Sequence, residues 1–130
     1  MLNKQQVIEA LVKFETEYQI PKHKILIFAG SAMVMRGLRD VCSDIDMGVP
    51  TEDIIRLQEF YGMLAKPSRF PGFLRVDYGI YDLGNNMYPS EPMEGYMVQT
   101  LESLLEMKLR MNREKDQTDI VKLKAELIVA

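Results

Sequence analysis

The sequence predicts a domain of the α/β or α+β class, with a mixed β-sheet flanked by helices. Segments with helical spacing of apolar residues alternate along the chain with short apolar runs typical of strands. The 130 residues match a domain of common size, and a hydrophobic content of 47% is enough to build a core. We therefore expect a single minimal domain over residues 1–130.

The first half of the chain is expected to form two helices and two strands. The first helix has apolar residues at helical spacing, and the second begins just after Ser31. The strands are short apolar runs that end near Gly30 and Pro50. These elements are a helix over residues 3–18, a strand over 25–29, a short helix over 32–38 and a strand over 44–49.

The second half opens with a helix for which Thr51 is the expected N-cap, because acidic residues follow it in the first turn. Gly79 predicts a bend or bulge, and Thr100 is the expected cap of a later helix. The other expected elements are a loop over 66–72, one long or two short strands over 73–83, an exposed loop over 84–95, a strand over 96–99, and helices over 101–111 and 115–128.

Composition favours a cytoplasmic protein. The only cysteine is Cys42, so no intrachain disulfide is expected, and the ten methionines also favour a reducing compartment. No apolar run has the length of a membrane span, and the first residues lack the apolar centre of a signal peptide, so no membrane partner is expected. The net charge of −3 does not indicate a general basic surface for nucleic acid.

Two aspartates, Asp44 and Asp46, alternate along the expected second strand. Alternation directs both side chains to one face. Two carboxylates about 4 Å apart repel each other by about 4 kcal/mol at an effective dielectric constant of about 20, so the pair favours a bridging cation. Mg²⁺ suits the pair because it prefers oxygen ligands and keeps positions open for substrate phosphates. The alternative is that both carboxylates are simply solvated.

Gly30 and Ser31 form a turn between the first strand and the short helix, and this turn suits a phosphate group. Glycine lets the backbone approach a phosphate closely, and amides at a helix start favour an anion. The Ser31 hydroxyl adds a donor. The alternative is an ordinary strand-to-helix turn with a serine cap. The nearby aspartates favour the phosphate interpretation.

A third carboxylate is expected to complete a two-metal site and to accept the proton of the acceptor hydroxyl. Asp77 and Asp82 are the candidates, and Asp77 is the first choice because an unpaired charge in mid-strand is costly. The expected metal ligands and catalytic residues are therefore Asp44, Asp46 and Asp77, with Asp82 in the place of Asp77 as the alternative.

Two motifs resemble those of the polymerase-β-like nucleotidyltransferase superfamily. The first is Ala29-Gly30-Ser31 followed by Ser43-Asp44-Ile45-Asp46. The second resembles the AbiEii-type nucleotidyltransferases of toxin–antitoxin and phage-defence systems, and consists of Lys108 followed by Arg113-Glu114-Lys115-Asp116-Gln117-Thr118-Asp119. Together the motifs cover most of the chain.

The resemblance implies a polymerase-β palm-like core, a nucleoside triphosphate at Gly30 and Ser31, and Mg²⁺ at the aspartate pair. Lys108 would meet the triphosphate or brace the site, and Asp116 and Asp119 would lie near the same cleft. The implied reaction transfers a nucleoside monophosphate and releases pyrophosphate. The acceptor hydroxyl is left open among a tRNA end, a protein and a small molecule.

Two rival interpretations accompany this expectation. One is a catalytically inactive nucleotidyltransferase-fold protein that binds nucleotide or a protein partner as a regulatory module. The other is a generic α/β protein with an incidental aspartate pair, in which the C-terminal charges form ordinary helix pairs such as Lys115 with Asp119 or Asp119 with Lys122. Arg36, Arg39 and Arg69 are expected to be solvated, with contact to phosphate as the alternative. His23 is assigned no role, and Cys42 is expected to be a small filler next to the site.

Overall fold

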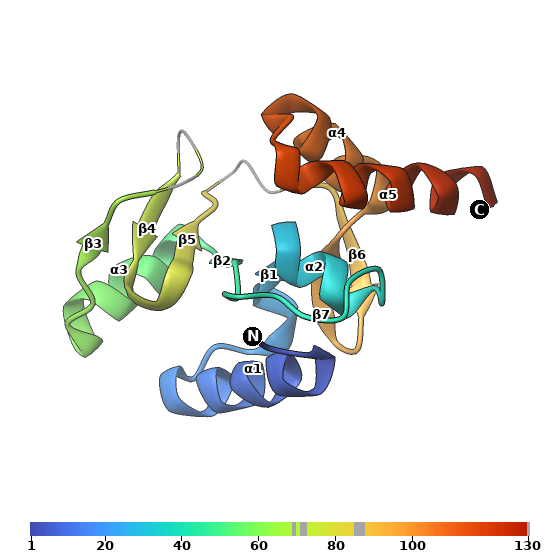
Figure 1. Cartoon of the computed structure of the whole chain (residues 1–130). Coiled ribbons are helices and arrows are strands. Elements are labelled where there is room, and N and C mark those ends of the chain that lie inside the picture. Colours follow the sequence, from blue (N-terminus) through green and yellow to red (C-terminus); the bar gives the residue numbers. More distant parts are fainter. Residues whose placement is uncertain (69, 71–72, 85–87, 130) are drawn as a thin grey trace.

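The computed structural model describes residues 1–68, 70, 73–84 and 88–129. Over these residues the chain forms a seven-stranded mixed sheet and five α-helices, which confirms the mixed α/β class (Figure 1). The same residues include no helix that is long and apolar enough to cross a membrane.

Seven short strands form the sheet: β1 (Leu26–Ile27), β2 (Met47–Val49), β3 (Ala65–Lys66), β4 (Leu74–Val76), β5 (Ile80–Asp82), β6 (Ser90–Met93) and β7 (Tyr96–Gln99). Their order is β3-β4-β5-β2-β1-β7-β6. β1 runs parallel to β7 and β2 runs parallel to β5, whereas the other neighbours are antiparallel. The two strands nearest the functional motifs, β1 and β2, therefore lie in the middle of the sheet.

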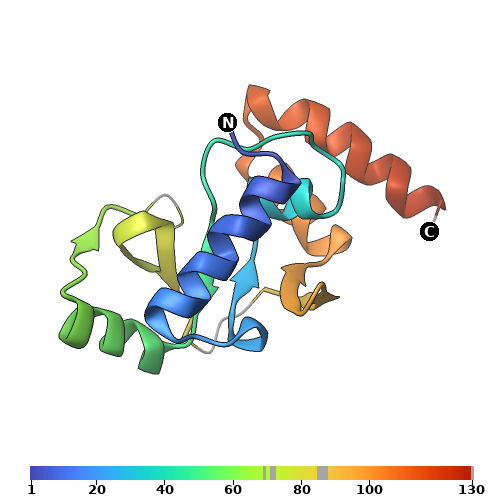
Figure 2. The same ribbon diagram turned by 90° about the horizontal axis from the view of Figure 1, so that it is seen from below.

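The helices cover both sides of these central strands. They are α1 (Lys4–Tyr18), α2 (Ala29–Met35), α3 (Thr51–Tyr61), α4 (Leu101–Met111) and α5 (Gln117–Val129). Helix α1 lies on one side of the sheet centre, and α4 and α5 lie on the other (Figure 1). Seen from below, α1 crosses the middle of the molecule, between the β3–β5 side and the β6–β7 side (Figure 2).

Two apolar clusters hold these layers together. The main core joins α1, α2 and α3 to the sheet and also includes Leu104 of α4 and Leu123 of α5. The second cluster is aromatic, and the ring of Phe28 lies 5.2 Å from Phe70 and 5.4 Å from Tyr81 between centroids. Such edge-to-face ring pairs add to the free energy of burial. The aromatic cluster lies directly under the site described below, since Phe70 belongs to both.

Local capping signals explain the best-predicted helices. The Asn3 side chain accepts from the Gln6 amide at 2.9 Å and starts α1. The Thr100 hydroxyl accepts from the Ser103 amide at 3.2 Å, which confirms the predicted cap of α4. The prediction for Thr51 was wrong by one position, because Pro50 is the N-cap of α3 and the Thr51 hydroxyl donates to Asp82.

Several predicted boundaries near the motifs were also wrong. Strand β2 begins at Met47, so the aspartate pair lies in the segment that leads into the strand. Helix α2 begins at Ala29, so Gly30 and Ser31 lie inside its first turn. The predicted strand 25–29 is paired only at Leu26 and Ile27. Strand bounds depend on the partner strands, and the residue pattern along one segment does not contain that information.

The region over 73–83 contains two short strands, β4 and β5, separated by a 3₁₀ turn over Asp77–Gly79. Gly79 has a φ of 74°, as the predicted bend requires. The edge strands β3 and β6 were missed: β3 overlaps the start of the predicted loop 66–72, and β6 lies inside the predicted loop 84–95. Both are short or Pro-containing edge strands, which lack the apolar alternation of a buried strand.

Candidate functional site

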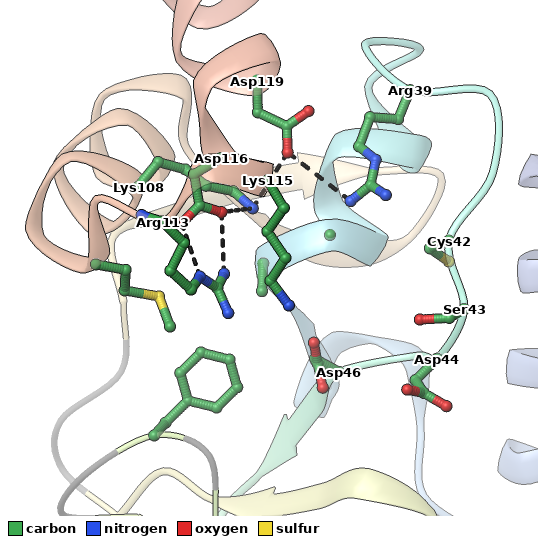
Figure 3. Close-up of a pocket in the computed structure, with 14 residues that line it drawn as sticks. Arg39, Cys42, Ser43, Asp44, Asp46, Lys108, Arg113, Lys115, Asp116 and Asp119 are labelled. Carbon is green, nitrogen blue, oxygen red and sulfur yellow. Dashed lines mark hydrogen bonds and ion pairs between the residues drawn. The ribbon is translucent and has the colours of Figure 1, made fainter.

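A pocket with a volume of about 190 Å³ lies where the two sequence motifs meet (Figure 3). Three parts of the chain form its polar walls: the start of α2, the segment over 39–46, and the C-terminal segment over 108–119. The residues that line it are Ala29, Gly30, Arg39, Cys42, Ser43, Asp44, Asp46, Phe70, Lys108, Met111, Arg113, Lys115, Asp116 and Asp119.

Asp44 and Asp46 lie next to each other at one end of the pocket (Figure 3). Asp46 is 7% exposed, whereas Asp44 is exposed. The backbone carbonyl of Asp46 accepts from the Phe28 amide at 3.1 Å, and this bond connects the segment to the end of β1. The aspartate pair is therefore anchored to the sheet although it precedes β2.

Ser31 contributes to the site in a way that the sequence did not indicate. Its side chain is fully buried, and its hydroxyl lies 2.9 Å from the Phe28 carbonyl and 3.1 Å from the Asp46 carbonyl, either of which accepts its proton. The same oxygen accepts from the Asp46 amide at 3.1 Å. Ser31 thus fixes the backbone of Asp46, and its hydroxyl is not among the groups that line the pocket.

Gly30 forms part of the pocket wall. A Cβ atom at this position would lie 2.9 Å from Nη1 of Arg39, so glycine leaves room for that guanidinium group. The residue before it, Ala29, has a φ of 55°, which is a strained conformation for a residue with a side chain. The Ala29 amide donates to Oε1 of Gln99 at 3.0 Å. This bond holds the strained turn in place.

Gln99 is a site-supporting residue that the sequence analysis missed. It is fully buried at the end of β7, and its amide nitrogen donates to the Ser103 hydroxyl of α4 at 2.9 Å. Gln99 therefore connects the turn at Ala29 to α4. The available signal was a polar side chain at the end of an otherwise apolar predicted strand.

Lys108 is the centre of a buried charge cluster on the C-terminal side of the pocket. Its side chain is 5% exposed, and Nζ lies 3.3 Å from Asp116 Oδ1 and 3.2 Å from Asp119 Oδ2. Both aspartates are buried as well. A buried charge is tolerated only when it is paired, so the three side chains depend on one another. Lys108 therefore lines the pocket and braces the segment that follows α4.

Arg113 forms a bidentate ion pair with Asp116. Nε of Arg113 donates to Oδ2 at 2.7 Å, Nη2 donates to Oδ1 at 3.0 Å, and the Arg113 amide also donates to Oδ2. Burial by itself would raise the pKa of Asp116. The hydrogen bonds from Arg113 and the charge of Lys108 outweigh that effect and lower the pKa to about 2. Asp116 is therefore ionised at neutral pH and is paired with two cations, Lys108 and Arg113.

Asp119 connects the C-terminal segment to the segment after α2. Its Oδ2 lies 3.8 Å from Nη1 of Arg39 in addition to its contact with Lys108. Lys122 donates to the Leu38 carbonyl at 3.1 Å. Asp119 thus pairs with Arg39 and Lys108, which are distant in the sequence, and Lys122 binds a backbone carbonyl. These contacts differ from the expected helix pairs of Asp119 with Lys115 or Lys122. Arg39 lines the pocket, contrary to the expectation that it is merely solvated.

The structure does not bring either predicted third carboxylate to this pocket. Asp77 accepts from the Leu64 amide at 3.3 Å and lies 3.6 Å from Nζ of Lys66, at the β3–β4 side of the sheet. It starts a 3₁₀ turn and is not in mid-strand. Asp82 accepts from the Thr51 hydroxyl at 2.7 Å and from the Gly84 amide at 2.9 Å. Both carboxylates have local structural partners.

The other polar residues named in the sequence analysis lie outside the pocket or at its edge, where the structure describes them. The side chain of Arg36 is 7% exposed, donates to the Gln99 carbonyl at 2.9 Å and pairs with Glu91, so the expectation that it is solvated was wrong. Cys42 is buried at the pocket edge, and burial raises the pKa of its thiol. His23 is exposed outside the pocket. Arg69 lies outside the described residues.

The pocket offers two carboxylates, Asp44 and Asp46, as ligands for Mg²⁺. Within residues 1–68, 70, 73–84 and 88–129, no group of three or more His, Cys, Asp or Glu side chains is arranged to hold a metal ion. Mg²⁺ is commonly bound by one or two carboxylates together with substrate phosphates and waters. Asp44 and Asp46 fit that smaller donor set, because both carboxylates line the same pocket.

No model of a known protein family matches the chain, and no curated protein or solved structure matches it either.

Proposed function

We propose that the chain is a metal-dependent nucleotidyltransferase that transfers a nucleoside monophosphate from a nucleoside triphosphate to a hydroxyl group. One observation carries the proposal: Gly30, the pair Asp44 and Asp46, and the cluster around Lys108 line the same pocket. These residues come from the two motifs that resemble nucleotidyltransferases. An incidental aspartate pair gives no reason for such a convergence.

The charge distribution of the pocket supports the same proposal. Asp44 and Asp46 lie at one end, and the side chains of Arg113 and Lys115 extend from the C-terminal segment toward Asp46 (Figure 3). Carboxylates favour a divalent cation, whereas guanidinium and ammonium groups favour phosphate oxygens. A metal-bound triphosphate carries both kinds of charge, and it would meet a complementary group at each end.

In this proposal the chain contributes mainly positioning and charge neutralisation. Arg113 and Lys115 bind the β- and γ-phosphates, and the backbone at Gly30 borders the phosphate chain. Lys108 and Asp116 keep Arg113 in place, as their contacts in the buried cluster require. Mg²⁺ held by Asp44 and Asp46 would neutralise the charge that develops on the phosphates.

The acceptor proton has a restricted set of destinations within the pocket. Asp116 and Asp119 are paired with buried or half-buried cations. The low pKa of Asp116, about 2, also makes that carboxylate a weak base. Asp44 and Asp46 lie at the opposite end of the pocket, beside the proposed metal, and in this proposal a carboxylate oxygen of this pair accepts the hydroxyl proton. Asp77 does not line the pocket and takes no part.

A nucleotide-binding regulatory module is the second candidate function. The observation that favours it is the position of Asp77 and Asp82, since neither supplies a third carboxylate to the pocket. This candidate shares the nucleotide site and differs in lacking catalysis. Binding and pyrophosphate release therefore have to be measured separately.

Isothermal titration calorimetry with Mg²⁺ and α,β-methylene ATP tests the nucleotide site. Asp46→Asn removes one metal-binding charge and is expected to weaken binding by at least about a hundredfold, the range expected when a charge that contacts the metal directly is lost. Asp40→Asn is the matched control, because Asp40 is exposed outside the pocket. Asp77→Asn is expected to bind like the wild type. Equal binding by wild type and Asp46→Asn would refute the site.

Pyrophosphate release from ATP then separates the two candidates. The enzyme releases pyrophosphate in the presence of Mg²⁺ and a panel of hydroxyl compounds, and Asp46→Asn does not. Wild-type protein that binds the nucleotide tightly but releases no pyrophosphate with any acceptor would favour the regulatory module.

A further inference from the structure

A second and larger pocket lies on the other side of the segment that carries the aspartate pair. Its volume is about 550 Å³, and it runs between helix α1 and the bend between β4 and β5. Three residues line both pockets: Ser43, Asp44 and Asp46. We call this second pocket the α1 groove. The aspartate pair thus stands between two cavities.

The α1 groove has the lining of a small-molecule site. Leu2, Phe14 and Met47 supply apolar surface, and Lys13, Glu17 and Arg75 supply charges of both signs. Pockets for organic ligands combine a mainly apolar wall with a few polar groups, and their volumes are typically about 300–1,000 Å³. The first pocket, with about 190 Å³ and a polar lining, suits a phosphate chain better than a whole organic molecule.

Arg75 gives the groove a polar group that a ligand could use. Its Nε is buried and has no hydrogen-bond partner among the described residues, while Nη1 donates to the Pro67 carbonyl at 3.1 Å. Leaving a buried donor unpaired costs free energy. Because this atom is closed to solvent, a ligand in the groove would meet the rest of the Arg75 guanidinium group.

We propose that the α1 groove binds the acceptor, an inference that rests on the proposed nucleotidyltransferase function. In-line transfer requires the acceptor oxygen to approach the α-phosphorus from the side opposite to the leaving pyrophosphate. With the phosphate chain in the first pocket, a molecule in the groove reaches the aspartate pair from the other side. In this arrangement the two carboxylates border both cavities because one cavity holds the phosphate chain and the other holds the acceptor.

Transfer exchanges one bond at the α-phosphorus for another. The acceptor oxygen forms a bond to the α-phosphorus, and the bond from that phosphorus to the α,β-bridging oxygen breaks. The bridging oxygen leaves with the electron pair as part of pyrophosphate. The hydroxyl proton passes to the carboxylate of Asp44 or Asp46 and then to water.

The groove also restricts the class of acceptor. Its lining includes two basic residues, Lys13 and Arg75, and three acidic ones, Glu17, Asp44 and Asp46. Nucleic acid requires cations that neutralise its phosphates, and this balance does not supply them. The acceptor is therefore a compact organic molecule with an apolar body and a hydroxyl group.

The experiment uses 2-naphthol, a fluorescent aromatic hydroxyl compound, as the probe. The chain contains no tryptophan, so the fluorescence of the probe is read against a low protein background. Ala10→Phe fills the groove from α1 and is expected to weaken 2-naphthol binding by about tenfold or more while the affinity for Mg²⁺ and α,β-methylene ATP changes by less than about twofold. Thr16→Phe is the control, since Thr16 is exposed on α1 outside the groove.

Lys13→Phe at the exposed rim of the groove repeats the test if Ala10→Phe proves unstable. The wild type is expected to bind 2-naphthol and the nucleotide analogue together, and 2-naphthol is expected to change the rate of pyrophosphate release from ATP. Competition between the two ligands, unweakened probe binding in both groove variants, or an unchanged rate would overturn the acceptor groove. Wild-type protein that fails to bind the nucleotide, measured without the probe, would instead refute the proposed function itself.

Discussion

The carboxylate of Asp116 shows how single residues hold this site together. It is about 1% exposed, yet it stays ionised because Lys108 and Arg113 both bind it. Buried charges of this kind contribute little net stability when complete, but removing one partner leaves the others uncompensated. Asp116 is therefore a positioning residue for Arg113 and Lys108, the cations that face the pocket.

The low pKa of Asp116 predicts a specific dependence of stability on pH. The pKa is about 2 in the folded chain and 3.8 for the unperturbed group, so the unfolded state binds the proton first as the pH falls. The stabilisation is complete above about pH 5 and is lost as the pH falls toward about 2. Between these limits, urea titrations are expected to show that the free energy of unfolding of the wild type falls by about 2 kcal/mol more than that of Asp116→Asn.

Asp40→Asn serves as the control for this prediction, because Asp40 is exposed. It is expected to lose stability with falling pH as the wild type does. A wild-type curve that runs parallel to that of Asp116→Asn over the whole range would contradict the ionised, doubly bound state of Asp116.

At the scale of elements, the short central strand β2 sets the position of the aspartate pair. Gly48 in its middle lies opposite Leu26 of β1 and Tyr81 of β5. A Cβ atom at Gly48 would lie 2.2 Å from Cδ1 of Leu83, whose side chain is buried. The glycine therefore allows Leu83 to cover β2 directly, and this packing fixes the strand that follows Asp46.

Gly48→Ala is expected to lower the free energy of unfolding by about 2 kcal/mol, because overpacking forces a buried side chain out of its place. The same change in a Leu83→Ala background is expected to cost much less, since the obstructing atoms are gone. A double-mutant cycle from urea unfolding measures this coupling. Strictly additive effects of the two substitutions would show that Leu83 does not set the need for glycine.

At the scale of the whole molecule, the pocket is closed by segments from distant parts of the chain. Gly30 lies in the first turn of α2 and Asp46 directly precedes β2, whereas Lys108 lies in α4 and Arg113 in the segment between α4 and α5. Arg39 and Lys122 add direct links between these parts through Asp119 and the Leu38 carbonyl. A ligand in the pocket would contact both parts of the chain at once. Because the pocket exists only when the chain is folded, such a ligand would bind the folded state alone.

A nucleotide bound in this way is expected to stabilise the whole domain by linkage. At a concentration of about 100 times its Kd, Mg²⁺ with α,β-methylene ATP is expected to raise the free energy of unfolding by about 2.7 kcal/mol. Chemical unfolding with and without the ligand measures the change. Adenosine with Mg²⁺ is the control, because it lacks the phosphates. An equal rise with adenosine would show that the phosphate-binding cations do not carry the interaction.

Parts of this site were predictable because their signals are local. The spacing of Gly30, Asp44 and Asp46 predicted that they lie together, and all three line one pocket. The same spacing could not show that Ser31 would turn inward to hold the Asp46 backbone. Asp77 was predicted for the site from its position in one segment, and its actual partners, Leu64 and Lys66, became apparent only once β3 was paired with β4.

The amino-acid sequence by itself determined the features that arise within a few residues: the capped helices α1 and α4, the bend at Gly79, the mixed class of the fold and the two charged motifs. Only the tertiary structure decided which charged groups face one another, as in the pairing of Asp116 with Lys108 and Arg113. It also decided that the aspartate pair borders two cavities. The physical reason is that caps and turns depend on neighbouring backbone groups, whereas burial and charge pairing depend on segments that strand order and helix packing bring together.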